Sequence, residues 1–259
     1  MGKVGIIIQA RTGSTRLPNK MIMDLEGKTL FEHIIERLTY TNYRDNIILA
    51  TTTKERDDIL FGLSSKLGIY GFRGSEEDVL ERFLGATKQY GLDIIVRVCA
   101  DNPFIDPEGI DLIVDYREKV NADHVDTYHE KGWPSGSGSE VITKEALLKI
   151  DELTKNESVK NLTYRENVTL FARDPQNKHL FRTGHVDAPL EILRSDLKLS
   201  VDILDELEAV RKVYKALYKP GSIISLREMI KFIDENPDVM SKVKEHGVPP
   251  YNLDHYLKK

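Results

Sequence analysis

Short apolar runs alternate with stretches of helical periodicity along the first 120 residues of the chain. A run such as VGIIIQA is apolar on both faces, which is typical of a strand buried on both sides. The expected strands cover residues 4–10, 46–52, 70–72 and 93–101. The expected helices cover residues 29–38, 55–67, a segment that begins at Ser75, and 107–119. Repeated strand–helix units predict an α/β fold with a mostly parallel, doubly wound sheet.

The alternation loosens after residue 120, although no clear linker or internal repeat interrupts the chain. Residues 133–141 are rich in glycine and serine and predict a flexible loop. Two strands are expected at 179–188 and 197–202, and helices at 158–173, 203–218 and 225–235. We therefore expect a single domain over residues 1–259, with a larger part up to about residue 120 and a smaller part at 121–259.

The bulk composition excludes several classes of protein. The chain has 37 basic and 42 acidic residues and a formal net charge of -5, which argues against nonspecific nucleic-acid binding. A single cysteine, Cys99, excludes an internal disulfide and a multi-cysteine metal site. No apolar run approaches ~18 residues, and the amino terminus has no signal-peptide pattern. These features predict a cytoplasmic protein without a membrane segment.

A basic loop follows the first expected strand. Arg11, Arg16 and Lys20 occur there, and no acidic residue precedes Asp24. In open α/β sheets, ligands bind beyond the carboxyl ends of the strands, which is where this loop lies. The N–H groups near Gly13 and Ser14 could form an anion-binding nest. Three cations without a local counter-acid indicate a polyphosphate ligand such as a nucleoside triphosphate, with a merely solvated basic loop as the alternative.

Two common phosphate-binding motifs are missing from the sequence. No G-x-G-x-x-G follows the first strand, and no G-x-x-x-x-G-K-[ST] occurs anywhere. A dinucleotide-binding domain and an ordinary P-loop enzyme are therefore both disfavoured.

Five ordered sequence blocks carry a resemblance to a known family. They are QARTGSTRLPNK (9–20), FRGSEEDVLERF (72–83), VRVCADNPFIDPEGID (96–111), YRENVT (164–169) and LKLSVDILDELEAVRKVY (197–214). Together they resemble the nucleotidyltransferases that activate sugar acids, which include the 3-deoxy-manno-octulosonate and acylneuraminate cytidylyltransferases. The similarity is greatest to the branch of spore coat polysaccharide biosynthesis protein F. The resemblance implies a Rossmann-like nucleotidyltransferase fold, CTP as donor, Mg²⁺ as cofactor, and a homodimer whose residues 121–259 serve acceptor binding and dimerisation.

The resemblance also implies roles for individual residues. The implied nucleotide-binding residues are Ala10, Arg11, Gly13, Ser14, Arg16, Lys20, Arg73, Gly74 and Ser75. The implied acceptor-binding residues are Arg97, Glu140, Arg165 and Glu166. Asp101 and Asp202 match the metal-binding aspartates, and Arg11, Lys20 and Asp101 would be catalytic.

Several of these residues have plainer interpretations. Asp101 could serve as a turn or cap residue, Asp202 as the N-cap of the helix at 203–218, and Ser75 as a helix cap. Arg97 lies in an apolar strand, so a structural salt bridge and a substrate contact remain equally open.

The chain departs from the family pattern at three positions. Cys99 and Ala100 replace the usual Thr-Gly before the first metal aspartate, and Asn19 replaces the glycine before the loop lysine. These changes bear on base selectivity more than on catalysis. The stretch that holds His124, Asp126 and His129 does not have a standard zinc-ligand spacing, and it predicts a strand with polar ends rather than a metal site.

The resemblance and the basic loop together predict transfer of CMP from CTP to a sugar acid or related acceptor, in the synthesis of precursors for surface polysaccharides. One alternative is a glycosyltransferase that uses a sugar nucleotide, although the chain contains no Asp-x-Asp motif. A second alternative is a non-catalytic nucleotide-binding protein of the same fold.

Overall fold

A seven-stranded sheet forms the centre of the molecule in the computed structural model, which describes residues 2–155 and 158–246. The strand order is β5-β4-β1-β6-β8-β7-β9. The strands are β1 (Val4–Gln9), β4 (Ile47–Thr52), β5 (Tyr70–Gly74), β6 (Ile94–Cys99), β7 (His124–Asp126), β8 (Glu140–Thr143) and β9 (Thr183–His185). Only β8 runs antiparallel to its neighbours, so the prediction of a mostly parallel α/β sheet is confirmed.

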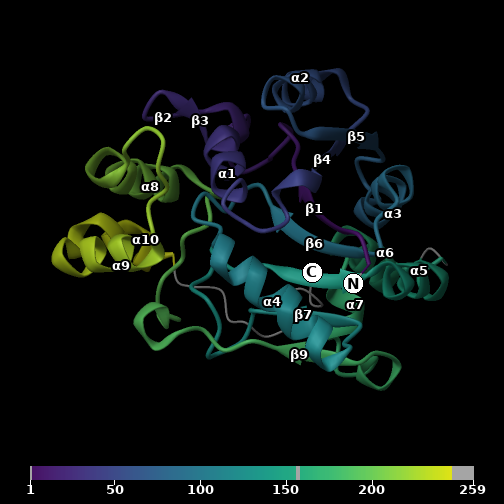
Figure 1. The fold of residues 1–259 in the computed structure, drawn as a ribbon. Coiled ribbons are helices and arrows are strands. Elements are labelled where there is room, and N and C mark those ends of the chain that lie inside the picture. The colour runs from purple at the N-terminus through teal and green to yellow at the C-terminus, as the bar shows by residue number, and fades with distance from the viewer. Residues whose placement is uncertain (1, 156–157, 247–259) are drawn as a thin grey trace.

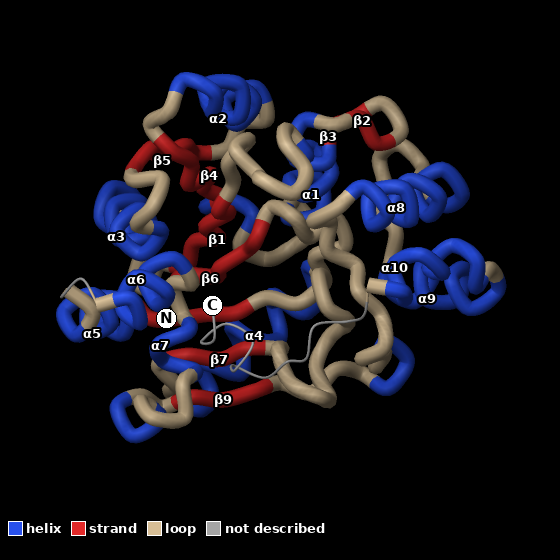
Figure 2. Tube along the Cα trace, turned by 180° about the vertical axis from the view of Figure 1, so that it is seen from behind, coloured by secondary structure: helices blue, strands red, loops and turns tan. Residues whose placement is uncertain are grey.

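Helices cover both faces of this sheet (Figures 1 and 2). The core on the first face contains residues of α1 (Leu30–Leu38), α4 (Pro107–Val120), α8 (Leu204–Leu217), α9 (Leu226–Glu235) and α10 (Ser241–Glu245), and α9 and α10 pack against α8. The second face packs against α3 (Val79–Tyr90), α5 (Lys144–Leu153), α6 (Val159–Glu166) and α7 (Leu170–Arg173). Successive residues of β1 explain the two cores, because Ile6 and Ile8 face one side and Ile7 the other, all with no exposed surface.

Two smaller features complete the chain. The helix α2 (Asp58–Lys66) connects β4 to β5, and a two-stranded hairpin of β2 (Asp24–Leu25) and β3 (Lys28–Thr29) follows the basic loop. Within the described ranges, none of the helices combines the length and apolar character needed to cross a bilayer. Residues 247–259 lie outside the described residues.

Three expected elements differ from the structure. The segment 197–202 is not a strand, because its one ladder contact is a bridge between Ser135 and Lys198. Its alternating pattern is nevertheless real, since Leu197, Leu199 and Val201 are all buried in the core. The expected strand 179–188 shortens to β9, and the helix expected at 158–173 divides into α6 and α7.

The helix expected to begin at Ser75 begins instead at Val79. Asp78 is its N-cap, and the Asp78 side chain accepts a hydrogen bond of 2.9 Å from the N–H of Glu81. Ser75 caps only the preceding turn, in which its hydroxyl accepts a hydrogen bond from the N–H of Asp78. The helix-cap interpretation of Ser75 is therefore wrong, and the residue is left facing a cavity.

Candidate active site

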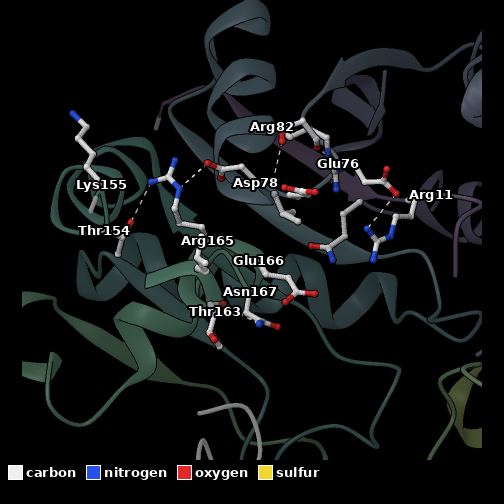
Figure 3. A pocket seen from close by; sticks show the side chains of 16 residues that line it. Arg11, Glu76, Asp78, Arg82, Thr154, Lys155, Thr163, Arg165, Glu166 and Asn167 are labelled. Carbon is white, nitrogen blue, oxygen red and sulfur yellow. Dashed lines mark hydrogen bonds and ion pairs between the residues drawn. The ribbon is translucent and has the colours of Figure 1, made fainter. Parts of the chain in front are cut away.

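Two cavities open at the carboxyl edge of the parallel strands. Cavity 1, of about 780 Å³, lies between the basic loop, the start of α3 and the end of α6 (Figure 3). Cavity 2, of about 400 Å³, lies between the basic loop, the end of β6, α7 and residues 198–202. Gln9, Glu166 and Asn167 line both cavities, so a ligand that extends from one to the other would pass these three side chains.

The basic loop is held in place by a buried aspartate. The N–H and the hydroxyl of Thr12 each donate a 2.7 Å hydrogen bond to one carboxylate oxygen of Asp57, and the hydroxyl of Thr52 donates to the other. Asp57 has no exposed surface and comes from the turn before α2. Sequence reasoning missed this anchor, because an aspartate at a helix start gives no sign of a partner 45 residues earlier.

The backbone of the loop differs from the expected anion nest. The N–H of Ser14 donates to the carbonyl of Thr12 at 2.9 Å, so it points into the loop and not toward a ligand. Asn19 has φ 61°, a left-handed conformation that glycine and asparagine tolerate best. This finding explains why asparagine can replace the usual glycine before Lys20 without a change of backbone conformation.

Four charged side chains meet where the basic loop approaches cavity 2. The ammonium of Lys20 lies 3.4 Å from Asp101 Oδ2, 3.1 Å from Asp202 Oδ1 and 2.6 Å from the carbonyl of Val201. Arg16 contributes a guanidinium 2.8 Å from the same Asp202 oxygen. We call these four residues the loop cluster: Arg16, Lys20, Asp101 and Asp202. The structure thus brings two of the three loop cations, Arg16 and Lys20, together with the two distant aspartates that the sequence singled out.

The plainer interpretation of Asp202 does not hold. The N-cap of α8 is Ile203, and the carboxylate that accepts its N–H belongs to Glu206. The Asp202 carboxylate points instead to Lys20 and Arg16. Burial alone would raise the pKa of Asp202, but these two positive charges hold the pKa below its usual value. Asp202 is therefore an ion-pair partner of the loop cations and not a helix cap.

Arg11 faces cavity 1, away from the loop cluster. Its guanidinium lies 3.6 Å from Glu76, and Figure 3 marks this ion pair with a dashed line. The expectation that the loop cations have no counter-acid is wrong in three dimensions, because Glu76, Asp101 and Asp202 supply the charges that the local sequence lacks. Each cation is thus balanced by a carboxylate on another element.

A second charged network lies under the floor of cavity 2. Arg97 bonds through Nη1 to Glu140 and donates through Nε to Gln9 Oε1 at 3.0 Å. The other Glu140 oxygen lies 2.9 Å from His124 Nε2. We call Gln9, Arg97, His124 and Glu140 the strand cluster. Burial would raise the pKa of Glu140, yet the Arg97 charge and the His124 hydrogen bond hold that pKa far below its usual range.

Comparisons with known proteins agree with this geometry. The family model described as cytidylyltransferase matches residues 5–219. The chain belongs to the cytidylyltransferase family. It is 34% identical over 247 residues to the spore coat polysaccharide biosynthesis protein SpsF of Bacillus subtilis, covering 93% of this chain and 98% of the relative.

Two further comparisons extend this result. An uncharacterized protein of Methanocaldococcus jannaschii is 39% identical over 235 residues, which cover 90% of this chain and 91% of the relative. The solved structure of a cytidylyltransferase from Leptospira borgpetersenii superposes with a TM-score of 0.82 at 29% identity, covering 92% of this chain and 97% of that one. The chain is therefore a nucleotidyltransferase with the Rossmann-like fold that the resemblance implied.

Two of the residues expected near the nucleotide of this cytidylyltransferase are turned elsewhere. Arg73 donates to the carbonyls of Thr52 and Lys54, both at 2.9 Å, and pairs with Asp58 at 2.5 Å. Neither Arg73 nor Gly74 lines either cavity in the part of the chain that the structure describes. Arg73 thus fixes the turn after β4, while Ser75 and Ala10 do line cavity 1.

The expected acceptor residues have four different positions. Arg97 forms the salt bridge that one interpretation required, and because it also lines cavity 2, substrate contact stays a prediction. Glu140 has no exposed surface and lines neither cavity, so direct acceptor contact is wrong for this structure, and the residue positions Arg97. Arg165 faces cavity 1, where it pairs with Asp78 at 2.6 Å and Asp151 at 2.9 Å. Glu166 is the exposed member, at the boundary of the two cavities.

Sequence reasoning missed three cations that line the cavities. Arg82 of α3 reaches cavity 1, and burial together with the nearby charge of Arg11 lowers the pKa of Arg82 to about 10. Arg173 and Lys198 line cavity 2. Arg82 and Arg173 lie in helical segments and Lys198 in an apparent strand, where a basic residue normally faces solvent. Only the fold shows that these side chains face inward.

Proposed function

We propose that this cytidylyltransferase transfers CMP from CTP to a hydroxyl of a sugar acid or related anionic acceptor, with release of pyrophosphate. The observation that carries the proposal is the loop cluster, in which Lys20 and Arg16 lie against two carboxylates beside cavity 2, where Arg16, Asp101 and Asp202 form part of the lining. The name of the Bacillus subtilis relative supports a place in polysaccharide precursor synthesis.

The two cavities suit the two substrates. Cavity 1 is lined by Ala10, Arg11 and Ser75, which belong to the sequence blocks that resemble the nucleotidyltransferase family, and it would hold the nucleoside. Cavity 2 is lined by Arg16, Arg97, Arg173 and Lys198, which would hold phosphates and the acceptor carboxylate. The attacked phosphate would then lie near Gln9 and Asn167, which line both cavities.

Asp101 and Asp202 fit a magnesium ion by the chemistry of their donor atoms. Both offer carboxylate oxygens, the ligands that Mg²⁺ prefers, and both already contact one cation, the ammonium of Lys20. A bound Mg²⁺ would neutralise charge on the phosphates of the nucleotide. Lys20 and Arg16 would then exchange their carboxylate partners for phosphate oxygens and stabilise the charge that develops on pyrophosphate, an electrostatic form of catalysis.

A pyrophosphate-release screen tests the proposal. The four ribonucleoside triphosphates are each combined with a panel of sugar acids and related acids in the presence of Mg²⁺. We expect release with CTP and at least one acidic acceptor, and loss of release when Mg²⁺ is chelated. Release with another triphosphate but not with CTP would refute the donor assignment. The homodimer and the cytoplasmic location implied by the resemblance remain predictions beside this proposal.

A further inference from the structure

A group of metal-binding side chains lies at the far edge of the sheet, outside the loop cluster. Asp126 ends β7, His129 follows in the next turn, and His185 ends β9, the strand beside β7 (Figure 2). One ligand atom from each residue lies within 4.8 Å of the others. The two imidazole rings have centroids 5.2 Å apart. The parallel pairing of β7 with β9 sets Asp126 directly opposite His185, so the fold itself brings these residues together.

Two buried polar atoms of this group have no hydrogen bond among the described residues. They are Oδ2 of Asp126 and Nδ1 of His129. Asp126 has no exposed surface, and its Oδ2 has only longer contacts, 3.5 Å to Arg173 Nε and 4.0 Å to His124 Nδ1, among the described residues. A buried polar atom without a hydrogen bond is unfavourable, so it indicates a missing partner such as a bound ion.

The tautomer of His129 leaves its unsatisfied nitrogen ready to bind a cation. The Nε2 atom of His129 lies 2.7 Å from a carboxylate oxygen of Asp187. A carboxylate accepts hydrogen bonds, so Nε2 carries the proton and Nδ1 keeps its lone pair. Metal-binding histidines are commonly oriented in this way, with the second ring nitrogen donating to a carboxylate. Asp187 would therefore orient His129 without binding the ion itself.

The charges around the group favour a cation, and the site can be reached from solvent. Asp126 and Asp187 are the two carboxylates in contact with the histidines, against one guanidinium from Arg173. The guanidinium of Arg173 also lies over the ring of Tyr128, 5.3 Å from its centroid. About half of the His185 side chain is exposed, at 53%.

We propose that Asp126, His129 and His185 bind a divalent transition-metal ion, with Zn²⁺ favoured over Mg²⁺. Two imidazoles and one carboxylate suit zinc, whereas magnesium prefers oxygen ligands alone. The spacing of His124, Asp126 and His129 gave no zinc motif because the third ligand comes from β9 and His124 belongs to the strand cluster. The ion would join the ends of β7 and β9 beside Arg173, which also lines cavity 2.

Cobalt binding measures this site directly. The full chain is titrated with Co²⁺ in excess Mg²⁺, which keeps Co²⁺ away from Asp101 and Asp202, and the visible absorption of nitrogen-bound cobalt is followed. We expect one equivalent to bind to the wild type, with Zn²⁺ displacing it. His129→Gln and His185→Gln should each weaken binding by at least ~100-fold, and Asp187→Asn by about 10–100-fold.

Matched variants separate this site from the rest of the chain. His179→Gln changes an exposed histidine outside the group, and Asp101→Asn changes the loop cluster, so both should bind Co²⁺ as the wild type does. Thermal unfolding provides a second measurement, in which Zn²⁺ should raise the Tm of the wild type but not that of His185→Gln. Equal Co²⁺ affinity in the wild type and both histidine variants, or no binding by the wild type, would overturn the proposal.

Discussion

The loop cluster and the strand cluster contain the same kinds of ion pair in two different environments. In the loop cluster, 63% of the Arg16 side chain and 31% of the Asp101 side chain are exposed, whereas Lys20 and Asp202 keep 10% and 15%. In the strand cluster, Glu140 has no exposed surface and Arg97 only 11% of its side chain. Exposed ions can exchange partners with a ligand at low cost, whereas buried ions cannot leave theirs without a large desolvation penalty. The first cluster is therefore suited to binding and the second to holding the floor of cavity 2 in place.

The strand cluster should show the largest effect, and the effect should be on stability. Glu140→Ala leaves the Arg97 charge buried without its partner, which typically costs about 3–5 kcal/mol. Chemical denaturation should report this loss in the free energy of unfolding. Arg227→Ala is the matched control, because it removes an exposed pair with Glu191 that is worth less than about 1 kcal/mol. Equal losses in the two variants would show that the strand cluster is not a buried unit.

Substitutions in the loop cluster should reduce turnover more than stability. Lys20→Ala and Asp101→Asn should each reduce turnover by about 10²–10³-fold, as expected when one preorganised charge is lost at a reacting phosphate. Steady-state pyrophosphate release measures this change, and the Tm of Asp101→Asn, whose side chain is partly exposed, should stay close to that of the wild type. Lys231→Ala, an exposed lysine on α9, provides the control. Turnover within a few-fold of the wild type in both variants would contradict the assignment of the reacting phosphate to this cluster.

The backbone that carries Lys20 should respond in a graded way. Asn19→Ala places a side chain with no compensating hydrogen bond in the left-handed conformation, at a cost of roughly 1–2 kcal/mol. Asn19→Gly removes that strain, so its unfolding midpoint should lie at a denaturant concentration at least as high as that of the wild type. Comparing the unfolding midpoints of these two variants tests the backbone conformation itself. If alanine is tolerated as well as glycine, the loop does not keep φ 61° in solution.

The sequence predicted the fold correctly where the burial pattern of a segment also indicates that the segment pairs with neighbouring strands. Continuous apolar runs located β1, β4 and β6 within a residue or two, because a strand buried on both faces admits little else. The segment 197–202 shows where this logic fails. Its alternation correctly reported which side chains are buried, but alternation does not show whether a neighbouring strand is there to pair with.

The candidate site was predictable where all of its parts lie at the ends of strands or in recognisable blocks. The meeting of Lys20 with Asp101 follows from the rule that ligand groups gather at the carboxyl edge. Asp202 was located by its sequence block, because the segment before it is not a strand. The anchor Asp57 and the opposing residue His185 could not be predicted. Their roles depend on register between segments far apart in the chain, which no local spacing encodes.

Substitution of Arg16 should have the smallest effect of the four, and it should change the KM for CTP while leaving the stability of the fold nearly unchanged. Its pair with Asp202 is exposed on the arginine side, so Arg16→Ala should cost less than about 1 kcal/mol of stability. If Arg16 exchanges Asp202 for a phosphate, the same variant should raise the KM for CTP about tenfold, because a charge-assisted hydrogen bond is worth about 1.5–3 kcal/mol. Arg16→Lys should restore part of this loss, since it keeps the charge but not the paired donors. A KM unchanged in Arg16→Ala would mean that Arg16 keeps Asp202 as its partner throughout the reaction, and the loop cluster would then resemble the strand cluster more than its exposure suggests.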